Sequence, residues 1–353
     1  MNVCNPAEVR ALLERYQLAP KKGFGQNFLI NPGVPQRIAE CSRGLAPMDR
    51  SAGVLEIGPG VGALTQYLSE YYDKVTAIEI DRGLIPLLGE VFADHDNITV
   101  VNADFMETDL SAFIEEHFSD ILAEGGTVSI CANLPYYITT PVLMRILENW
   151  SPELPVPLAG ITVMVQLEVA RRICATAEDG DYGALSAAVG LKADAMKMFD
   201  VSAGNFYPVP KVASSVCGIV PHDGIRQVYD RVPEDPETAA KFAQSVTDTI
   251  GMAFGQRRKT LVNGLSGKYA KDVTAAALEK MGLRTDIRGE KLSPAEFCRL
   301  TAILQGIEQY NTNKNCCIFF RHSSFFVIGI FVGVYSAVSS AAPSAASRAS
   351  RAL

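Results

Sequence analysis

Short apolar runs of strand length alternate with stretches of helical spacing over the first 220 residues of the chain. The runs that predict strands are 53–57, 74–80, 98–103, 127–132, 161–165, 195–201 and 212–220. Helical stretches follow several of them, among them 84–93 and 139–150. Strands that alternate with helices indicate parallel β-α-β units with right-handed crossovers. We therefore predict a doubly wound α/β sheet within residues 23–220, closed by its last strand.

A different pattern begins after residue 220. Residues 221–237 are rich in turn formers and acids, which predicts a linker. Helical spacing then fills residues 238–308, and the predicted helices are 239–254, 257–265, 273–281 and 294–309. Asp272 precedes the third of these helices, and Ser293 followed by Pro294 is a start signal for the fourth. We predict a small all-helical domain here.

The two ends of the chain differ from both regions. Residues 1–22 read as an N-terminal extension with a short helix at 6–18. Residues 309–353 are first apolar and then rich in Ala and Ser, and we expect the end to be disordered. The longest nearly apolar run, 325–338, has 14 residues, fewer than the ~20 that cross a bilayer. We interpret this tail as an accretion, such as a read-through or frame change, and expect no membrane association.

Charge is distributed unevenly along the chain. The overall charge of −7 and the pI near 5.3 argue against binding nucleic acid by bulk charge. Residues 256–299, however, contain ten Lys or Arg against five acids, a local net charge of +5. Arg257, Arg258 and Lys259 form the best candidate for a phosphate contact. An ordinary solvated helical face explains the same composition.

The eight cysteines are scattered, without a C-x-x-C pair and without a histidine at metal-ligand spacing. This usage is typical of reduced thiols packed as small apolar groups, so we expect no metal site. Charged residues are spread through the first 22 positions, which does not fit a secretory leader. We expect a cytoplasmic protein.

A glycine loop follows the first strand of the sheet and precedes a helix. Its pattern is Glu56-x-Gly58-x-Gly60-x-Gly62, in which the missing side chains let the backbone approach a ligand closely. Glu79 ends the next strand, 21 positions after Gly58, where a carboxylate can bind ribose hydroxyls. The combination predicts a site for a nucleoside-containing cofactor.

The glycines alone leave two cofactor classes open. Gly58, Gly60 and Ala63 also fit the dinucleotide pattern G-x-G-x-x-G/A, so an NAD-dependent oxidoreductase remains an alternative. The ends of the later strands favour a different chemistry. Asp104 follows the third strand and can accept a hydrogen bond from an adenine amino group, and residues 133–136 (Asn-Leu-Pro-Tyr) follow the fourth.

The residue types at 133–136 suit chemistry on an exocyclic amine. The amide oxygen of Asn133 and the carbonyl of Leu134 can accept both N–H bonds of the amine, which localises its lone pair for attack on a sulfonium methyl. Pro135 fixes the turn because its ring restricts φ. Tyr136 can stack on an extruded base, a contact of about 1 to 3 kcal/mol. Orientation and electrostatics would then drive the reaction, without a metal or a covalent intermediate.

The chain resembles the small-subunit (16S) rRNA adenine dimethyltransferase family over residues of about 20 to 308. The resemblance rests on five ordered segments, which are 24–29 (Phe-Gly-Gln-Asn-Phe-Leu), 55–60 (Leu-Glu-Ile-Gly-Pro-Gly), 133–136, 206–212 and 254–260 (Phe-Gly-Gln-Arg-Arg-Lys-Thr). It implies a Rossmann-like class I methyltransferase sheet and S-adenosylmethionine as cofactor. It also implies dimethylation of N6 of two adjacent adenines near the 3′ end of small-subunit rRNA, with a role in ribosome biogenesis.

The resemblance assigns roles to particular residues. Phe206 is implied as the second face of a base pocket, opposite Tyr136. The implied cofactor contacts are Asn27, Leu29, Gly58, Glu79, Asp104 and Asn133. The implied partner is a small-subunit precursor particle bound by a monomer. Two further alternatives are a large-subunit rRNA adenine methylase of the antibiotic-resistance type and a non-catalytic ribosome assembly factor.

Overall fold

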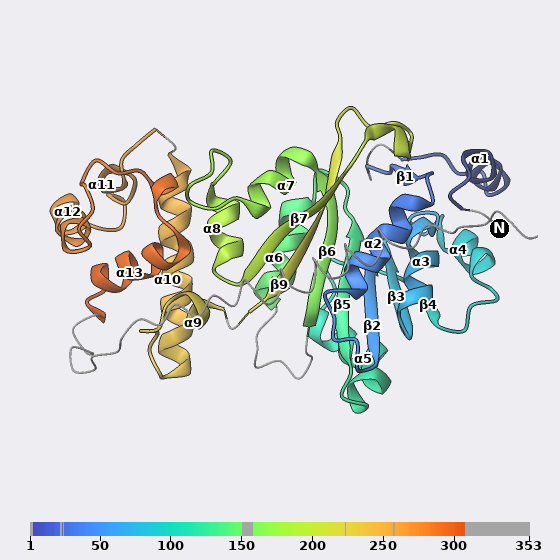
Figure 1. Cartoon of the computed structure of the whole chain (residues 1–353), viewed down its shortest axis with the longest axis horizontal. Helices are drawn as coiled ribbons and strands as arrows, with labels where there is room; N and C mark the ends of the chain where they lie inside the picture. Colours follow the sequence, from blue (N-terminus) through green and yellow to red (C-terminus); the bar gives the residue numbers. More distant parts are fainter. Residues whose placement is uncertain are drawn as a thin grey trace, which may run out of the picture. The chain divides into compact units, whose positions relative to one another are not determined.

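The computed structural model describes residues 3–21, 23, 25–149, 158–222, 224–256 and 258–307. Within these residues a seven-stranded sheet has the order β4-β3-β2-β5-β6-β9-β7 (Figure 1). Its strands are β2 (Ala52–Ile57), β3 (Lys74–Glu79), β4 (Ile98–Asn102), β5 (Thr127–Asn133), β6 (Leu158–Gln166), β7 (Ala193–Val201) and β9 (Ser214–Pro221). Strands β2 to β6 pair in parallel. The predicted α/β sheet is confirmed.

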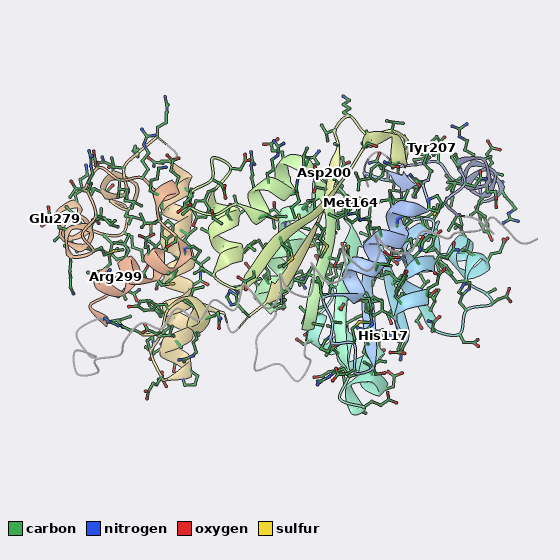
Figure 2. All side chains as sticks on the ribbon, viewed as in Figure 1. His117, Met164, Asp200, Tyr207, Glu279 and Arg299 are labelled. Atoms are coloured by element: carbon green, nitrogen blue, oxygen red, sulfur yellow. The ribbon has the colours of Figure 1, made fainter. Side chains whose placement is uncertain are left out.

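The last strand does not close the sheet as predicted. Strand β9 lies between β6 and β7 and is antiparallel to both, so β7 forms the edge. The pattern of burial explains this order, because six successive residues of β9 are buried while most of β7 is partly exposed. Charged side chains such as Lys197 and Asp200 suit an edge strand, where they discourage pairing with another chain. Asp200 is labelled in Figure 2.

Alternate side chains of the central strands enter two separate apolar cores. Leu55 and Ile57 of β2 pack in the first core, together with α5 (Leu110–Ala123) and α6 (Thr139–Asn149). Ala52 and Val54 pack in the second core, on the other face of the sheet. The helices of that second core are α1 (Pro6–Arg15), α2 (Gly33–Arg43), α3 (Ala63–Tyr71) and α4 (Ile85–Val91). The sheet is therefore covered on both faces, as a doubly wound fold requires.

Two short helices follow β6 and lead toward the C-terminal helices. They are α7 (Leu167–Cys174) and α8 (Ala184–Gly190). Buried residues of and around α8, including Ala187 and Leu191, belong to the third apolar core, which the C-terminal helices share. The hydroxyl of Tyr182 donates to the carbonyl of Leu292 over 2.8 Å, which adds a polar link between the two regions.

The C-terminal region is helical, as predicted. Its helices are α9 (Ile225–Val228), α10 (Pro236–Gly255), α11 (Leu261–Gly264), α12 (Lys271–Lys280) and α13 (Pro294–Leu304). Ser293 caps α13 as its sequence predicts, and a reciprocal hydrogen bond with Glu296 completes a capping box. Exposed charged side chains cover the outside of these helices, among them Glu279 and Arg299 (Figure 2).

Three details of the predicted helices are wrong. Helix α12 begins at Lys271 with Ala270 at its cap, so Asp272 lies inside the first turn. Helix α11 covers only part of 257–265, because the N–H of Lys259 donates to Gln256 O and closes a turn before it. Helix α13 ends at Leu304 and not at residue 309.

The predicted linker 221–237 is part of this helical packing. It contains α9 and contributes the buried side chain of Val232 to the third core. The division at these residues into two domains stays a prediction. The tail 309–353 lies outside the described residues. No helix in the described part of the chain has the length and apolarity to cross a bilayer.

Candidate active site

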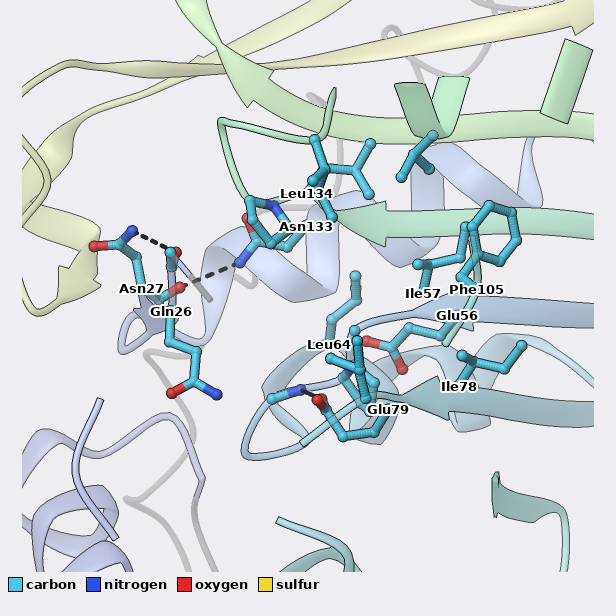
Figure 3. Close-up of a pocket in the computed structure, with 18 of the residues that line it drawn as sticks. Gln26, Asn27, Glu56, Ile57, Leu64, Ile78, Glu79, Phe105, Asn133 and Leu134 are labelled. Carbon is cyan, nitrogen blue, oxygen red and sulfur yellow. Dashed lines mark hydrogen bonds between the residues drawn. The ribbon is translucent and has the colours of Figure 1, made fainter. Parts of the chain in front are cut away.

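A cavity of about 310 Å³ lies at the carboxyl ends of β2 to β5 (Figure 3). Strands β2 and β5 are neighbours, but the chain reaches β5 only after building β3 and β4 on the other side of β2. This arrangement makes the gap between β2 and β5 the switch point of the sheet, where open α/β folds bind ligands. Of the predicted cofactor and catalytic residues, the cavity wall contains Asn27, Leu29, Glu56, Gly58, Gly60, Glu79, Asp104, Asn133, Leu134, Pro135, Tyr136 and Phe206.

The glycine loop divides into two parts with different roles. Gly58 and Gly60 have φ of +71° and +61°, and both line the cavity. A side chain at Gly58 would meet no protein atom within 4 Å, so the space beside it is open to a ligand. Gly62 is not on the cavity wall. Its φ is +90°, and a Cβ there would lie 2.5 Å from the ring of Phe92. We conclude that Gly62 is required for packing.

Glu79 is held in place by two backbone N–H groups. Its Oε2 accepts from Gly60 over 3.2 Å, and its Oε1 accepts from Asp81 over 2.8 Å. The side chain is only 4% exposed and lines the cavity. Burial raises the pKa of this carboxyl group, and the two backbone hydrogen bonds oppose the rise. The carboxylate is thus fixed at the edge of the cavity with the glycine loop beside it.

Glu56 is a second buried acid on the cavity wall (Figure 3). Its Oε2 is buried and has no hydrogen-bond partner in the protein. Burial, together with the charge of nearby Glu79, raises the pKa of Glu56 to about 8. Below this pKa the carboxyl group carries a proton, so an empty site favours neutral Glu56 and a positively charged ligand would favour its ionised form.

Asp104 lies on the cavity wall after β4. Its Oδ1 accepts the N–H of Met106 over 2.8 Å, and its backbone carbonyl accepts the hydroxyl of Thr108 over 2.7 Å. These bonds fix the short loop that follows the strand. The partly buried carboxylate is therefore presented to the cavity by a rigid turn.

The segment 133–136 leaves the end of β5 and turns across the cavity. The side-chain Nδ2 of Asn133 donates to the carbonyl of Asn27 over 3.3 Å (Figure 3). The N–H of Leu134 donates to the carbonyl of Met164 on β6 over 3.1 Å. With its nitrogen engaged, the amide of Asn133 offers its oxygen to a ligand.

Two aromatic rings complete this end of the cavity. Tyr136 is partly buried, and Phe206 is 1% exposed. Phe206 belongs to β8 (Phe206–Tyr207), which pairs antiparallel with β1 (Phe28–Leu29). This two-stranded sheet brings Phe206 to the cavity from a position 70 residues after Tyr136 in the chain.

Sequence reasoning missed several residues of the wall. Gly25 and Gln26 line the cavity within a segment already noted for its motif, and Tyr137 lines it directly after Tyr136. Tyr137 is 59% exposed. The pair of tyrosines at 136 and 137, directly after a strand, was the sequence feature that could have indicated its place on the wall. The apolar wall residues Ile57, Ile78 and Phe105 give no such signal, because the same residues are expected in any buried strand end.

Two of the three predicted RNA contacts lie in the described part of the chain. Arg258 and Lys259 are exposed in the turn between α10 and α11, and neither lines the cavity. Arg257 lies outside the described residues. In the described part of the chain, no group of three or more His, Cys, Asp or Glu side chains could hold a metal ion.

The fold is an α/β fold with a cavity at the switch point of its sheet, walled by a glycine loop and by the buried acids Glu56 and Glu79. Residues 18–306 match the family model described as ribosomal RNA adenine dimethylase. The chain belongs to this family, and the resemblance expected from its motifs is confirmed. It is therefore a methyltransferase, and the nicotinamide-dependent alternative is not supported.

Individual relatives agree with the family. The chain is 38% identical over 307 residues to ribosomal RNA small subunit methyltransferase A of Shouchella clausii, covering 86% of this chain and 96% of that protein. It is 38% identical over 311 residues to the protein of the same name from Streptococcus pneumoniae serotype 2, covering 87% and 99%.

Solved structures also resemble this chain. The 23S rRNA methyltransferase ErmE has a TM-score of 0.55 and 26% identity, covering 79% of this chain and all of that one. A dimethyladenosine transferase from Plasmodium falciparum has a TM-score of 0.59 and 22% identity, covering 80% and 97%. The second likeness shows the shared fold alone.

Proposed function

We propose that this enzyme uses S-adenosylmethionine to dimethylate N6 of two adjacent adenines near the 3′ end of small-subunit rRNA. The observation that carries the proposal is the placement of Asn133 at the switch-point cavity, with its amide nitrogen bonded to Asn27 O and its amide oxygen left for a ligand. The names of the most similar curated relatives support the small subunit as the source of the substrate.

The cavity residues fit S-adenosylmethionine, which supplies an electrophilic methyl group when bound. Glu79, fixed by two backbone N–H groups, would accept from the ribose hydroxyls. Asp104 would accept from the adenine amino group of the cofactor. Glu56 lies on the cavity wall, and its carboxyl group suits the ammonium group of the cofactor's methionine part. The backbone of Asn27, Leu29, Gly58 and Gly60 would line the remainder of the cofactor site.

Asn133 and Leu134 would orient the substrate amine. The lone pair of the adenine amino nitrogen is delocalised into the ring, so the nitrogen is a weak nucleophile until that pair is localised. Acceptors at Asn133 Oδ1 and Leu134 O would bind the two N–H groups and favour a pyramidal nitrogen. The hydrogen bond from Leu134 N–H to Met164 O fixes the backbone at this position. This pre-set geometry lowers the barrier by positioning.

Tyr136 and Phe206 would hold the extruded base between them. Each base–aromatic contact contributes about 1 to 3 kcal/mol. Pro135 restricts the turn that carries Tyr136, and the Tyr136 hydroxyl is within 3.0 Å of the Ser214 hydroxyl. The stacking energy offsets the unstacking that extrusion requires.

The proposed partner is a precursor of the small ribosomal subunit, bound by a monomer in the cytoplasm. We propose that Arg257, Arg258 and Lys259 contact its phosphates through the turn that precedes α11. The two described members of this cluster are exposed, which supports the proposal.

Labelled methyl transfer to three substrates in parallel tests the function. The substrates are small subunits lacking the modification, naked rRNA and large subunits. We expect transfer of up to four methyl groups per small subunit and little transfer to large subunits. Preferred labelling of large subunits would favour the antibiotic-resistance type of activity. S-adenosylmethionine binding without transfer to any of the three would favour a non-catalytic assembly factor.

A further inference from the structure

Asp81 is a buried acid that the proposed reaction does not use. It follows β3 and is 4% exposed. Its Oδ1 accepts from Lys21 Nζ over 2.7 Å, and its Oδ2 accepts from the side-chain amide of Gln26 over 3.1 Å. Burial alone would raise the pKa of Asp81, but the hydrogen bond from Lys21 and those from Gly83 and Gln26 lower it overall. Asp81 is thus a charged anchor for a segment that lies 55 to 60 residues earlier.

The anchored segment forms part of the cavity wall. We call Lys21 and residues 25–29 the strap, and residues 25–29 form one continuous part of the cavity wall. The backbone N–H of Lys21 donates to the Gln26 side-chain oxygen over 2.8 Å, which ties the two anchored residues together. The end of the strap is held separately, because Phe28 and Leu29 pair with Tyr207 and Phe206 of β8.

Between its two anchors the strap contacts the catalytic turn. A Cβ at Gly25 would lie 3.2 Å from the Cβ of Pro135, so the strap backbone packs closely on that turn. Asn27 then presents its carbonyl oxygen to the side-chain nitrogen of Asn133 over 3.3 Å. The side-chain amide of Asn27 donates back to Gly25 O over 3.0 Å, which stiffens the strap at this point.

The Asn133 amide must face one particular way for the proposed reaction. An amide has a donor end and an acceptor end. Rotation by 180° would direct the NH₂ group at the N–H bonds of the substrate amine and the oxygen at Asn27 O. Donor would then face donor and acceptor would face acceptor. The carbonyl of Asn27 therefore selects the productive orientation.

We propose that Asp81 is a positioning residue for methyl transfer. It holds Lys21 and Gln26, and through them the strap, so that the Asn27 carbonyl keeps the Asn133 amide oxygen toward the substrate amine. This inference rests on the proposed function. Residues 25–29 also form part of the cavity wall. A cofactor bound in the cavity would therefore contact the same segment that orients the Asn133 amide.

The test compares Lys21→Met, Lys21→Arg and Asp81→Asn with the parent enzyme. Lys21 is about half exposed, so its replacement leaves the core intact. Single-turnover methyl transfer is measured at saturating S-adenosylmethionine, which removes any effect of weaker cofactor binding. We expect Lys21→Met and Asp81→Asn to be slower by about 100-fold, a loss that a ~1 Å misplacement of a catalytic group can cause. Lys21→Arg should recover to within about tenfold of the parent, because it keeps the charge.

The matched control is Lys74→Met. Lys74 begins β3 and pairs with Asp120 over 2.8 Å, so this variant removes an ion pair from the opposite end of the same strand. Its rate should equal that of the parent. Rates within twofold of the parent for both Lys21→Met and Asp81→Asn would overturn the proposal. Weaker cofactor binding with an unchanged saturating rate would also overturn it, because the strap would then be only a wall of the cofactor site.

A spectroscopic measurement separates this inference from the proposed function. The side-chain amide resonances of Asn133 report its hydrogen bond directly in ¹⁵N NMR. We expect them to shift in Lys21→Met and to stay in place in Lys74→Met. A parent enzyme that methylates no RNA would refute the function, and the Asn133 resonances would still decide the role of the anchor. Unchanged Asn133 resonances in Lys21→Met would refute the positioning role of Asp81.

Discussion

The phenol oxygen of Tyr136 lies 3.0 Å from the hydroxyl oxygen of Ser214, which is the first residue of β9. This contact joins the turn after β5 to the one antiparallel strand of the described sheet. Tyr136 is therefore held from both ends, by the turn at Pro135 and by its hydroxyl. The ring is set in place before a base arrives.

Replacing Tyr136 separates the tether from the ring. Tyr136→Ala removes the stacking face, and we expect methyl transfer to fall by about 5- to 150-fold, the equivalent of 1 to 3 kcal/mol. Tyr136→Phe keeps the face and should lose less than about tenfold. Ser214→Ala removes the same hydrogen bond from the other side and should match Tyr136→Phe. Single-turnover rates check the series, and a Tyr136→Phe rate as low as that of Tyr136→Ala would contradict the stacking role.

Asn133→Ala removes the acceptor that orients the amine. We expect methyl transfer to fall by about 100- to 1,000-fold, comparable with the loss of one preorganised group in other active sites. Folding should change little, because Asn133 is only partly buried. S-adenosylmethionine affinity should fall much less than the rate, because Glu79, Asp104 and the glycine loop remain to hold the cofactor. Calorimetry with the cofactor and labelled transfer to small subunits measure the two effects. Near-normal transfer would exclude Asn133 as the orienting group.

The meeting of the residues at the ends of the central strands could be predicted from the chain. Parallel strands bring their carboxyl ends to one edge, so Gly58, Glu79, Asp104 and Asn133 had to meet once the β-α-β pattern was recognised. The place of β9 could not be predicted in the same way. No β-α-β unit connects β7 and β9, so the parallel pattern sets no order for them, and only the charged residues of β7, such as Lys197 and Asp200, indicate an edge strand.

Contacts between segments that lie far apart in the chain also could not be predicted from the sequence. Nothing in the local pattern of Lys21 or Gln26 indicates that Asp81, some 60 residues later, accepts hydrogen bonds from both. The role of Gly62 could not be predicted either. In sequence, a loop glycine required because a side chain would clash with a ring cannot be distinguished from one that lets a ligand approach the backbone. Only the position of Phe92 distinguishes the two.

Two glycine substitutions in the same loop should therefore have different effects. Gly62→Ala places a Cβ 2.5 Å from Phe92 at a φ of +90°, and we expect a loss of about 2 to 4 kcal/mol of unfolding free energy. Gly58→Ala meets no protein atom within 4 Å, so only the backbone strain of about 1 to 2 kcal/mol applies. Its new methyl group faces the ligand space and should weaken cofactor binding by at least about tenfold. Urea unfolding and calorimetry test the pair, and equal losses of stability would contradict the assignment.

Glu56 predicts a particular dependence of stability on pH in the cofactor-free enzyme. Its pKa is about 8 in the folded protein, above the ordinary value of 4.5. Since the folded state binds the proton more tightly, the stabilising contribution is fully present below pH 4.5 and is lost as the pH rises through 8. Glu56→Gln should remove this loss, so the variant gains stability relative to the parent between pH 5 and pH 9.

Thermal unfolding across that pH range measures the Glu56 effect. The exposed Glu107, which does not line the cavity, provides a matched Glu→Gln control. Adding S-adenosylmethionine at pH 8 should reduce the difference between Glu56→Gln and the parent, if the ammonium group of the cofactor pairs with the ionised Glu56. A parent and variant with parallel stability curves would show that Glu56 ionises normally in the folded protein.

Arg258 and Lys259 should contribute to RNA affinity through phosphate contacts. Each neutralised phosphate changes the slope of log K against log salt concentration by about 0.7 to 0.9. Replacing both residues by Ala should therefore reduce the slope by about 1.4 to 1.8 and leave cofactor affinity unchanged, because neither residue lines the cavity. Lys241→Ala, at an exposed lysine near the start of α10, is the matched control. RNA binding titrations between 50 and 200 mM salt, about the range in which such contacts weaken, check both variants. An unchanged slope in the double variant would make these two residues an ordinary solvated turn and move the RNA interface elsewhere on the enzyme.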